Sequence, residues 1–503
     1  MERVSSHPVL TCAEAKVWEA GLLKDEVAEW SAMQRAGAAL AAAIEEDFKE
    51  IGGLPDDARL LVLMGKGHNG GDAVIAATAL LKHRPRARVT IHPVFGTGSP
   101  RPLTQRALQE FVLAAGNGEE PFDWKAAQVN SYDLCLDGIF GMQFRPPLEE
   151  TTAKMLAWVN THPRIRFRAA IDLPSGMGEG NAGTVFRADF TYATGIVKVP
   201  LVAESNAIYT GRLRYLDLGF FRENQPASSL RVLQDSVLAP LAKLRAAQSE
   251  KRTYGHLFVV GGSRNYPGAV LMTVQAALRS GVGLLTAFVP ASLVPEYAVK
   301  FPEVMWIGWP ETPTGGLAAA GVKLLLEKLP RATALVIGPG LGSEPETLAA
   351  VQEIVVAATV PLLLDADALR PEVIGAAQGR RFICTPHAGE FKRIAAGLKL
   401  DDNTVLVLKG SPTRIHAGGV VYHSFFGGPV LARGGSGDLL TGLIGGLLAQ
   451  ASDDLLLAAG RGVVWHGLAA DLLARAKGQV AVQTTQLLDY LQPALLSTAH
   501  DPL

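Results

Sequence analysis

The sequence predicts an α/β protein made of two doubly wound domains. The chain has 503 residues, which is more than one hydrophobic core usually serves. Short apolar runs alternate with helix-length segments in two successive series, the pattern expected of parallel sheets covered by helices. Hydrophobic residues make up 48% of the chain and charged residues 19%, so enough apolar surface is present for two large buried sheets.

Composition also limits the partners. The formal net charge is -1 with both signs scattered, which argues against electrostatic attraction to nucleic acid or to an anionic membrane. No apolar stretch approaches the roughly 20 residues of a spanning helix, and the first 15 residues lack a signal pattern. We therefore expect a cytoplasmic protein that binds small molecules. Cys12, Cys135 and Cys384 lie far apart without metal-type spacing, and we expect all three to be buried free thiols.

The first domain opens with two predicted helices. Thr11 and Glu14 have capping-box spacing, and apolar residues then recur at helical intervals as far as Ile44. A strand at 60–64, a glycine-rich loop and a helix at 72–82 follow. Further strands are predicted at 89–94, 134–136 and 169–171.

The strand signals lapse after Phe221, and we place the domain boundary near Arg222, giving domains 1–222 and 223–503. Six short strands follow in the second domain: HLFVV, LLTAFV, ALVIG, PLLLD, RFICT and TVLVLKG. Only about a dozen residues separate Glu390 from the strand at Val405, so the helix between them must be very short. Gly418 and Gly419 predict the turn of a β-hairpin.

Three strand ends carry the candidate chemistry of the first domain. The segment Gly65–Ala73 is placed where backbone N–H groups and a helix dipole can hold a phosphate, although a simple tight turn explains the glycines equally well. Asp137 and Asp172 each follow an apolar strand. The carboxyl ends of parallel strands meet at one edge, so we expect these groups to converge.

This pattern resembles the YjeF N-terminal family of epimerases of hydrated nicotinamide cofactors, over about residues 10 to 220. The resemblance implies a Rossmann-like domain in which Asn69, Asp137 and Ser175 ligate K⁺ and Asp172 is the acid–base residue. It also implies a substrate site made of Asp172 and two loops, namely His68, Asn69, Gly70, Gly71 and Asp72, and Gly141, Met142, Gln143, Phe144, Arg145, Pro146 and Pro147. Two departures stand out: His68 replaces an asparagine, and Met142 with Gln143 replaces Thr-Gly.

In the second domain, Ala432–Asp438 precedes an apolar helix at 439–450. Glycine N–H groups at a helix start make an anion site with a carboxylate beside it, as phosphoryl transfer requires. An ordinary glycine-rich helix start is the structural alternative. Four more polar segments follow strands and are expected at the same sheet edge: 338–342, 365–367, 385–390 and 408–410. His387 by itself is more often a hydrogen-bonded structural residue than a ligand contact.

With Gly261–Ser263, Tyr266–Ala269 and Pro302–Met305, these motifs resemble the carbohydrate-kinase-type NAD(P)H-hydrate dehydratases, over about residues 235 to 495. The resemblance implies a ribokinase-like fold, ADP or ATP as phosphoryl donor, Mg²⁺, and Asp438 as the catalytic base. It assigns Ala269, Gly340, His387 and Asp438 to the hydrated cofactor, and Lys409, Gly410, Ser411, Pro412, Thr413 and Gly437 to the nucleotide. Departures are Ala388, where the family has proline, and the shortened segment after Glu390.

The two resemblances together imply a fused repair enzyme for the hydrates of NADH and NADPH, with homo-oligomers expected from the relatives. A vitamin or sugar kinase with a non-catalytic N-terminal ligand-binding module is the alternative, because the anion site and Asp438 would serve a kinase too. A kinase would release a stable phosphorylated product. No motif in the sequence distinguishes ADP from ATP.

Overall fold

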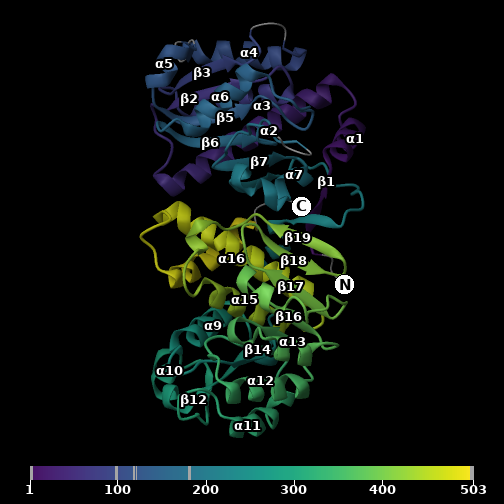
Figure 1. Cartoon of the computed structure of the whole chain (residues 1–503), viewed down its shortest axis with the longest axis vertical. Helices are drawn as coiled ribbons and strands as arrows, with labels where there is room; N and C mark the ends of the chain where they lie inside the picture. Colours follow the sequence, from purple (N-terminus) through teal and green to yellow (C-terminus); the bar gives the residue numbers. More distant parts are fainter. Residues whose placement is uncertain (1–3, 97–99, 117–118, 121, 179–182, 499–503) are drawn as a thin grey trace. The chain divides into compact units, whose positions relative to one another are not determined.

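The computed structural model describes residues 4–96, 100–116, 119–120, 122–178 and 183–498, which form two compact units. The N-terminal unit comprises His7–Leu230 with Ala474–Gln479, and the C-terminal unit comprises 4–6, 231–473 and 480–498. Each unit contains its own parallel sheet with flanking helices (Figure 1). The main-chain division between the units falls after Leu230.

The N-terminal unit contains the elements predicted from residue 11 onward. Thr11 caps the first helix with Glu14 in the predicted capping box, and the second helix buries Leu40 and Ile44. The elements are β1 Ser6–Leu10, α1 Cys12–Leu22, α2 Glu26–Phe48, β2 Arg59–Met64, α3 His68–His83, β3 Arg88–Pro93, α4 Pro102–Ala115, β4 Glu119–Glu120, α5 Trp124–Val129, β5 Tyr132–Gly138, α6 Glu150–Thr161, β6 Ile165–Ile171, β7 Phe190–Thr194, β8 Val197–Lys198, α7 Val199–Val202, α8 Ala207–Thr210 and β9 Arg212–Leu216.

The sheet of this unit has the strand order β4-β3-β2-β5-β6-β7-β9, and all its described pairs are parallel. The chain winds outward from β2 in one direction and from β5 in the other, so the order reverses between these two strands. Loops diverge at such a point and leave a crevice at the carboxyl ends of the strands. The predicted Rossmann-like topology is confirmed.

Helices cover both faces of this sheet. One apolar cluster joins α2, α3 and α4 to Leu60, Val62 and Met64 of β2, whereas another joins α6 to Leu61 and Leu63 of the same strand. Alternate side chains of β2 are thus buried on opposite faces, which explains its unbroken apolar sequence. A strand buried on both faces holds the following loop in a fixed position.

The C-terminal unit repeats this plan with a longer sheet. Its elements are β10 Leu230–Leu233, β11 His256–Val260, α9 Pro267–Arg279, β12 Leu284–Pro290, α10 Val294–Lys300, β13 Met305–Trp309, α11 Val322–Leu326, β14 Ala334–Ile337, α12 Pro345–Ala357, β15 Leu362–Leu364, α13 Pro371–Ala377, β16 Phe382–Cys384, α14 Ala388–Ile394, β17 Thr404–Leu408, β18 Thr413–Ala417, β19 Val420–Ser424, α15 Ser436–Gln450, α16 Leu455–Lys477 and α17 Leu491–Thr498.

Seven strands of this sheet, in the order β13-β12-β11-β14-β15-β16-β17, are parallel, and the strand order reverses between β11 and β14. The antiparallel pair β18–β19 then extends the sheet, with Gly418 and Gly419 at positive φ in its turn. This confirms the predicted hairpin. The predicted short helix after β16 is also confirmed, because α14 has only seven residues.

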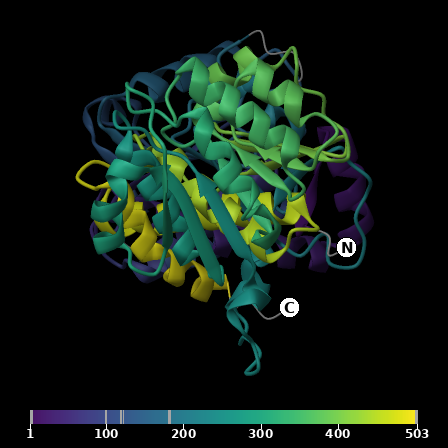
Figure 2. The ribbon, with the colours of Figure 1, turned by 90° about the horizontal axis from the view of Figure 1, so that it is seen from below.

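Two helical layers enclose the sheet of the C-terminal unit. One face packs against α11, α12 and α13 in a single apolar cluster. On the other face α15 contacts β11 and β14 and packs closely on α9, where a Cβ at Gly442 would lie 2.1 Å from the carbonyl oxygen of Thr273. Figure 2 gives a second view of the C-terminal unit, with α12 and α13 in green and α16 in yellow.

Three details refine the sequence analysis. Helix α3 begins at His68, so most of the predicted glycine-rich loop is the first helical turn. Cys135 and Cys384 are buried free thiols, but Cys12 is only half-buried, because it is the first residue of α1. Within the described part of the chain, no helix is both long and apolar enough to cross a membrane.

Candidate functional site

The glycines after β2 allow the start of α3 to pack against the neighbouring strand ends. A Cβ at Gly70 would lie 2.3 Å from the carbonyl oxygen of Gly65, and a Cβ at Gly138 would lie 2.8 Å from that of Asn69. Only glycine permits such close approach of backbone to backbone. The first turn of α3, with Asn69, is therefore held beside the end of β5.

Asp137, in β5, is the centre of a buried network. Its carboxylate is fully buried and accepts hydrogen bonds from Ser175 Oγ at 2.6 Å and from Ser175 N at 2.7 Å. Ser175 Oγ accepts a hydrogen bond from Phe140 N at 3.0 Å, and Asn69 Nδ2 donates to Phe140 O at 2.8 Å. Burial raises the pKa of Asp137 to about 6, against the hydrogen bonds from Ser175. The structure thus brings all three predicted K⁺ ligands together.

Asp172 lies directly after β6 and next to this network. It is 6% exposed and has φ 64°, a conformation that non-glycine residues rarely adopt and that recurs at functional sites. A Cβ at Gly141 would lie 3.4 Å from Asp172 Oδ2 and 3.6 Å from Asn69 Cγ. The loop that starts at Gly141 therefore faces both the predicted acid–base residue and a predicted cation ligand.

A cluster of charged groups, not foreseen from the sequence, surrounds Asp172. Lys198 Nζ, fully buried at the end of β8, donates to Asp172 Oδ1 and lies 3.9 Å from Glu19 Oε1 of α1. Burial raises the pKa of Glu19 to about 7, although Lys198 opposes the shift. The pKa of Asp72 is raised well above its usual value, first by burial and then by the charges of Asp172 and Glu19.

The remaining predicted residues of this site are more exposed. His68 Nε2 lies 3.7 Å from Glu29 Oε2, and burial lowers the pKa of the imidazole. Met142 packs on the apolar cluster of Trp18 and Phe220, while Gln143 accepts a hydrogen bond from Arg101 at 3.1 Å. Phe144 of the same loop packs on Phe140, and the last three predicted residues, Arg145, Pro146 and Pro147, are exposed.

In the C-terminal unit, the loops after β11 and β14 lock together. Ser263 Oγ donates to Gly340 O at 2.8 Å. Gly340 has φ 69°, and a Cβ there would lie 2.5 Å from Tyr266 O and 3.1 Å from Ala269 Cβ. Two predicted substrate contacts, Gly340 and Ala269, are therefore neighbours at the switch point of the sheet.

The partly buried Lys409 and the buried Asp365 form an ion pair beneath the glycine-rich loop. Lys409 Nζ donates to Asp365 Oδ1 at 2.8 Å, and Thr441 Oγ1 of α15 donates to Asp365 Oδ2 at 2.6 Å. Glu390 lies 3.8 Å from the same ammonium. A Cβ at Gly437 would lie 3.3 Å from Lys409 Nζ, so the ammonium sits directly under the first turn of α15.

Asp438 stands at the start of α15 beside this pair. Burial, followed by the negative charge of Asp365, raises the pKa of Asp438 to about 7, while Lys409 opposes the shift. A carboxyl with a pKa near 7 exchanges protons readily at neutral pH. Gly435, with φ 89°, ends the loop, and the fully buried His466 forms a hydrogen bond with the backbone of Ser436.

His387 has a structural role that the sequence left open. Its Nδ1 accepts hydrogen bonds from Gly389 N at 3.0 Å and Glu390 N at 3.2 Å, while Glu390 reaches back to His387 N at 2.8 Å. His387 is thus the N-cap of α14, and its exposed Nε2 remains available to a ligand. Backbone pairing with Lys409 places it beside the predicted nucleotide segment 409–413.

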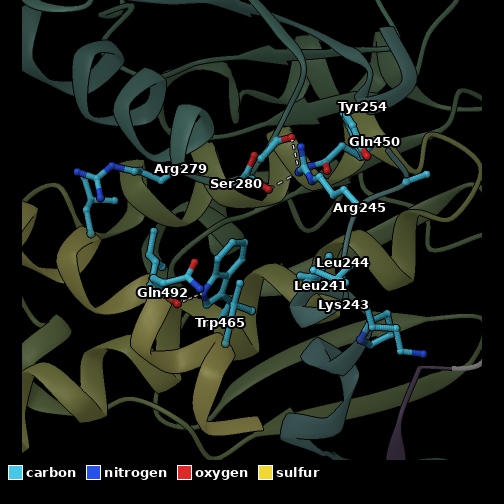
Figure 3. A pocket seen from close by; sticks show the side chains of 16 residues that line it. Leu241, Lys243, Leu244, Arg245, Tyr254, Arg279, Ser280, Gln450, Trp465 and Gln492 are labelled. Atoms are coloured by element: carbon cyan, nitrogen blue, oxygen red, sulfur yellow. Dashed lines mark hydrogen bonds between the residues drawn. The ribbon is translucent and has the colours of Figure 1, made fainter. Parts of the chain in front are cut away.

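A cavity of about 550 Å³ in the C-terminal unit lies away from this chemistry (Figure 3). It is lined by Arg245, Ser280, Gln450 and Trp465 among others, and it contains none of the predicted site residues. Gln450 is the last residue of α15, twelve residues beyond Asp438 or roughly 18 Å along the helix. The candidate site is the strand-end cluster, not this cavity.

No group of three or more His, Cys, Asp or Glu side chains that could hold a metal ion occurs in the described ranges. The Asn69, Asp137 and Ser175 set contains a single carboxylate, so a transition-metal centre is not expected there.

No motif in the sequence pointed to Lys198, Glu19 or the role of Asp365. Lys198 could have been noticed as a single lysine in an otherwise apolar strand and turn. Nothing marked Glu19, because its helix has an ordinary amphipathic pattern.

Comparisons with known proteins agree with both resemblances. The family described as "NAD(P)H-hydrate dehydratase" matches residues 257–493, and "YjeF-related protein N-terminus" matches residues 30–199. The chain is 33% identical to the bifunctional NAD(P)H-hydrate repair enzyme Nnr of Moorella thermoacetica, over 91% of each chain. It is 34% identical to the enzyme of the same name from Gloeobacter violaceus, over 96% of this chain and 97% of the relative.

Among solved structures, an ADP/ATP-dependent NAD(P)H-hydrate dehydratase from Bacillus subtilis, co-crystallized with ATP/Mg²⁺, is 28% identical. The match covers 53% of this chain and 97% of the solved chain, with a TM-score of 0.45.

Proposed function

This chain belongs to the family of bifunctional NAD(P)H-hydrate repair enzymes, and on that basis we propose that each unit carries one catalytic step. The N-terminal unit, corresponding to the predicted domain 1–222, interconverts the R and S epimers of NAD(P)H hydrate. The C-terminal unit, corresponding to 223–503, dehydrates the S form at the expense of ADP or ATP. The observation that carries the proposal is that each unit has a carboxyl at the candidate site of its own sheet: the buried Asp172 in one, and Asp438, with a raised pKa, in the other.

In the epimerase step, Asp172 exchanges a proton with the carbinol hydroxyl of the hydrate. The ring nitrogen supplies its lone pair, the C–O bond breaks, and the hydroxyl leaves as water with the proton from Asp172. Water then adds to the opposite face of the C=N bond and returns a proton to Asp172. Asp172 Oδ2 suits this role because it faces the loop at Gly141 and is not the oxygen paired with Lys198.

Asn69, Asp137 and Ser175 are proposed to hold K⁺. They offer amide, carboxylate and hydroxyl oxygens within one hydrogen-bonded network, and the carboxylate of Asp137 is buried with no cationic partner among its hydrogen bonds. A buried carboxylate without a counter-ion is costly, so the donor set fits a monovalent cation. Bound there, K⁺ would neutralise Asp137 and fix the strand ends on either side of the substrate.

In the dehydratase step, Asp438 takes the proton of the carbinol hydroxyl as that oxygen attacks the terminal phosphoryl group of the nucleotide. The bond from that phosphorus to the bridging oxygen breaks, and the remaining nucleotide leaves as AMP from ADP or as ADP from ATP. Phosphate is a far better leaving group than hydroxide. It then departs with the C–O bond, and loss of the proton from the adjacent ring carbon restores the dihydropyridine. The backbone N–H groups at the start of α15 face the developing phosphoryl charge.

The nucleotide is proposed to lie along Lys409–Thr413 and Gly437, with the hydrate against Ala269, Gly340 and His387. The ammonium of Lys409, fixed by Asp365, supplies one positive charge for the phosphates. Since the described residues offer no carboxylate cage, Mg²⁺ would be held mainly by the nucleotide phosphates and water, as is usual for this ion. There it would neutralise phosphate charge.

The test is recovery of NADH absorbance from NADH hydrate that contains both epimers, with Mg²⁺, K⁺ and either ADP or ATP. We expect complete recovery, and the effective nucleotide identifies the donor. Recovery that stops when one epimer is consumed would contradict the epimerase assignment. A stable phosphorylated product would contradict the dehydratase assignment and favour a kinase.

Oligomeric assembly stays a prediction from the relatives. Sedimentation of the purified full chain checks it, with a species larger than the 53.3 kDa monomer as the expected result.

A further inference from the structure

Lys198 is a buried cation beside the proposed acid–base residue of the epimerase. Its side chain is 1% exposed, and it lies at the end of the short strand β8, which pairs in parallel with β1 and places Leu10 opposite Lys198. Its ammonium donates a hydrogen bond to Oδ1 of Asp172. Neither the sequence motifs nor the proposed function assigns a role to this lysine.

The ion pair with Lys198 gives the two carboxylate oxygens of Asp172 different surroundings. Oδ1 receives the ammonium of Lys198, whereas Oδ2 lies on the side of Gly141, where a Cβ would be 3.4 Å away. The backbone of Asp172 adds a second constraint, since its φ of 64° and its hydrogen bond from Asp172 N to Tyr192 O, at 2.9 Å, fix the direction of the side chain. One oxygen is therefore held and the other is directed toward the substrate loop.

Four groups face Lys198 from the elements packed around it. Asp172 at the end of β6 and Glu19 on α1 lie within ion-pair distance, and Asp72 on α3 and Cys12 at the start of α1 contribute at longer range. These carboxylates raise the pKa of Lys198 above its usual value despite burial, which favours the loss of charge. Lys198 is therefore an ammonium at neutral pH.

A purely structural explanation of this ion pair is weak. Buried ion pairs contribute little net stability, because the cost of removing two charges from water offsets their attraction. Here the pair also accompanies a residue at positive φ, a conformation that persists where the surrounding structure enforces it. Apolar side chains at positions 172 and 198 would avoid the cost of burying two charges.

We propose that Lys198 is the positioning residue of the epimerase site: its ammonium holds Oδ1 of Asp172, so that Oδ2 alone exchanges the proton with the substrate. This inference rests on the proposed epimerase activity. In each half-step one proton moves between Asp172 Oδ2 and the oxygen that leaves or adds at the carbinol carbon, while Lys198 keeps its own protons. Lys198 touches neither substrate nor reacting atoms and acts through Asp172.

The test compares kcat and KM of the epimerase in Lys198→Met, Lys198→Gln and Lys198→Arg. Without the ammonium, Oδ1 is released and Oδ2 is no longer held toward the hydroxyl oxygen of the substrate. We therefore expect kcat of Lys198→Met to fall roughly 100-fold with KM nearly unchanged, because misplacing a reacting group lowers the rate of the chemical step rather than binding. Lys198→Gln is shorter and uncharged, so it is expected to lose kcat in the same way, and it replaces the Met variant if that does not fold.

Lys198→Arg restores the charge, and its kcat is expected to exceed that of Lys198→Gln at least tenfold. Lys154→Met is the matched control, because Lys154 is an exposed lysine of the same unit, paired with Glu150 on the same helix. An unchanged kcat in both neutral variants would overturn the inference, as would an arginine variant no faster than the glutamine variant. A wild-type chain without epimerase activity would instead overturn the proposed function, so the two failures are distinguishable.

Discussion

At the scale of single residues, both candidate sites contain a carboxylate–lysine ion pair. A buried carboxylate at a strand end is paired with a lysine at the end of another strand: Asp172 with Lys198 in one unit and Asp365 with Lys409 in the other. In the N-terminal unit the paired carboxylate is itself the proposed acid–base group. In the C-terminal unit the pair lies beside Asp438 and influences its proton affinity. Burial makes these charges strongly coupled, so single substitutions are expected to move pH profiles.

Asp365→Asn is expected to shift the pH dependence of the dehydratase downward. The pKa of Asp438 is about 7, and a base works only when ionised, so activity rises as the pH rises through about 7. The negative charge of Asp365 contributes to that raised pKa, and its removal lowers the midpoint. We also expect activity to fall about tenfold to 100-fold, since Lys409 loses the partner that fixes it.

The pH profile of kcat, measured with saturating nucleotide, checks this shift. Glu372→Gln, an exposed carboxylate on α13 of the same unit, is the control and should leave the profile unchanged. An upward shift in Asp365→Asn would contradict the assignment of Asp438 as the base.

The proposed K⁺ ligands predict a cation-specific stabilisation. A ligand that binds only the folded state stabilises by about 2.7 kcal/mol at 100 times its Kd. KCl should therefore raise the unfolding temperature of the N-terminal unit and the epimerase rate more than NaCl of equal concentration does. Asp137→Asn should abolish the difference between the two salts, because it removes the carboxylate of the set. Equal effects of both salts on the wild-type chain would argue against a K⁺ site.

At the scale of elements, short segments after strands position the chemistry. The first turn of α3 places Asn69, the first turn of α15 places Asp438, and α14 starts on His387. A close backbone approach holds the start of α3, and a capping hydrogen bond holds the start of α14. For α14 the cap and the proposed ligand contact belong to the same side chain.

Substitution of His387 can separate these two roles. Asparagine is a good N-cap whereas alanine is not, so His387→Ala should destabilise the C-terminal unit by about 1 kcal/mol and His387→Asn by only a few tenths. Both variants lose the imidazole Nε2, so both should raise the KM for the hydrate about tenfold. Chemical denaturation and steady-state kinetics check the two effects. A normal KM in His387→Asn would remove His387 from the substrate site.

At the scale of the whole molecule, each unit has its own sheet, its own core and its own strand-order reversal. The two proposed active sites are therefore expected to work independently, because all residues of each site belong to one unit. The hydrated cofactor is a free small molecule, so one unit's product can reach another chain by diffusion.

Two inactive variants should therefore complement each other. Asp172→Asn alone should leave recovery of NADH incomplete, because one epimer remains, and Asp438→Asn alone should give no recovery. An equimolar mixture should restore complete recovery from both epimers. The rate should be about half that of the wild-type chain, since each kind of site is intact in only half of the chains. Recovery that stays incomplete in the mixture, with each variant folded, would show that both sites must act within one chain.

The sequence by itself determined the fold class, the strand-end positions of Asp137, Asp172 and His387, the helix-start position of Asp438, and the family. These features depend on local patterns, namely apolar periodicity and glycine-rich motifs. Such patterns can be recognised without knowing which residues distant in the chain are in contact. The start of α3 at His68 was not predicted, because glycine-rich segments usually form loops. The close packing of Gly70 on Gly65 explains why Gly70 and Gly71 lie in a helix.

The tertiary structure decided how the charges are paired. Lys198 and Asp172 are separated by 26 residues, and Lys409 and Asp365 by 44, so no spacing rule could connect them. Parallel strands bring such residues to one edge, and burial then makes their interaction strong enough to set a pKa. The proposed acid–base chemistry can be read from the motifs, but its tuning depends on pairs that only the folded chain creates.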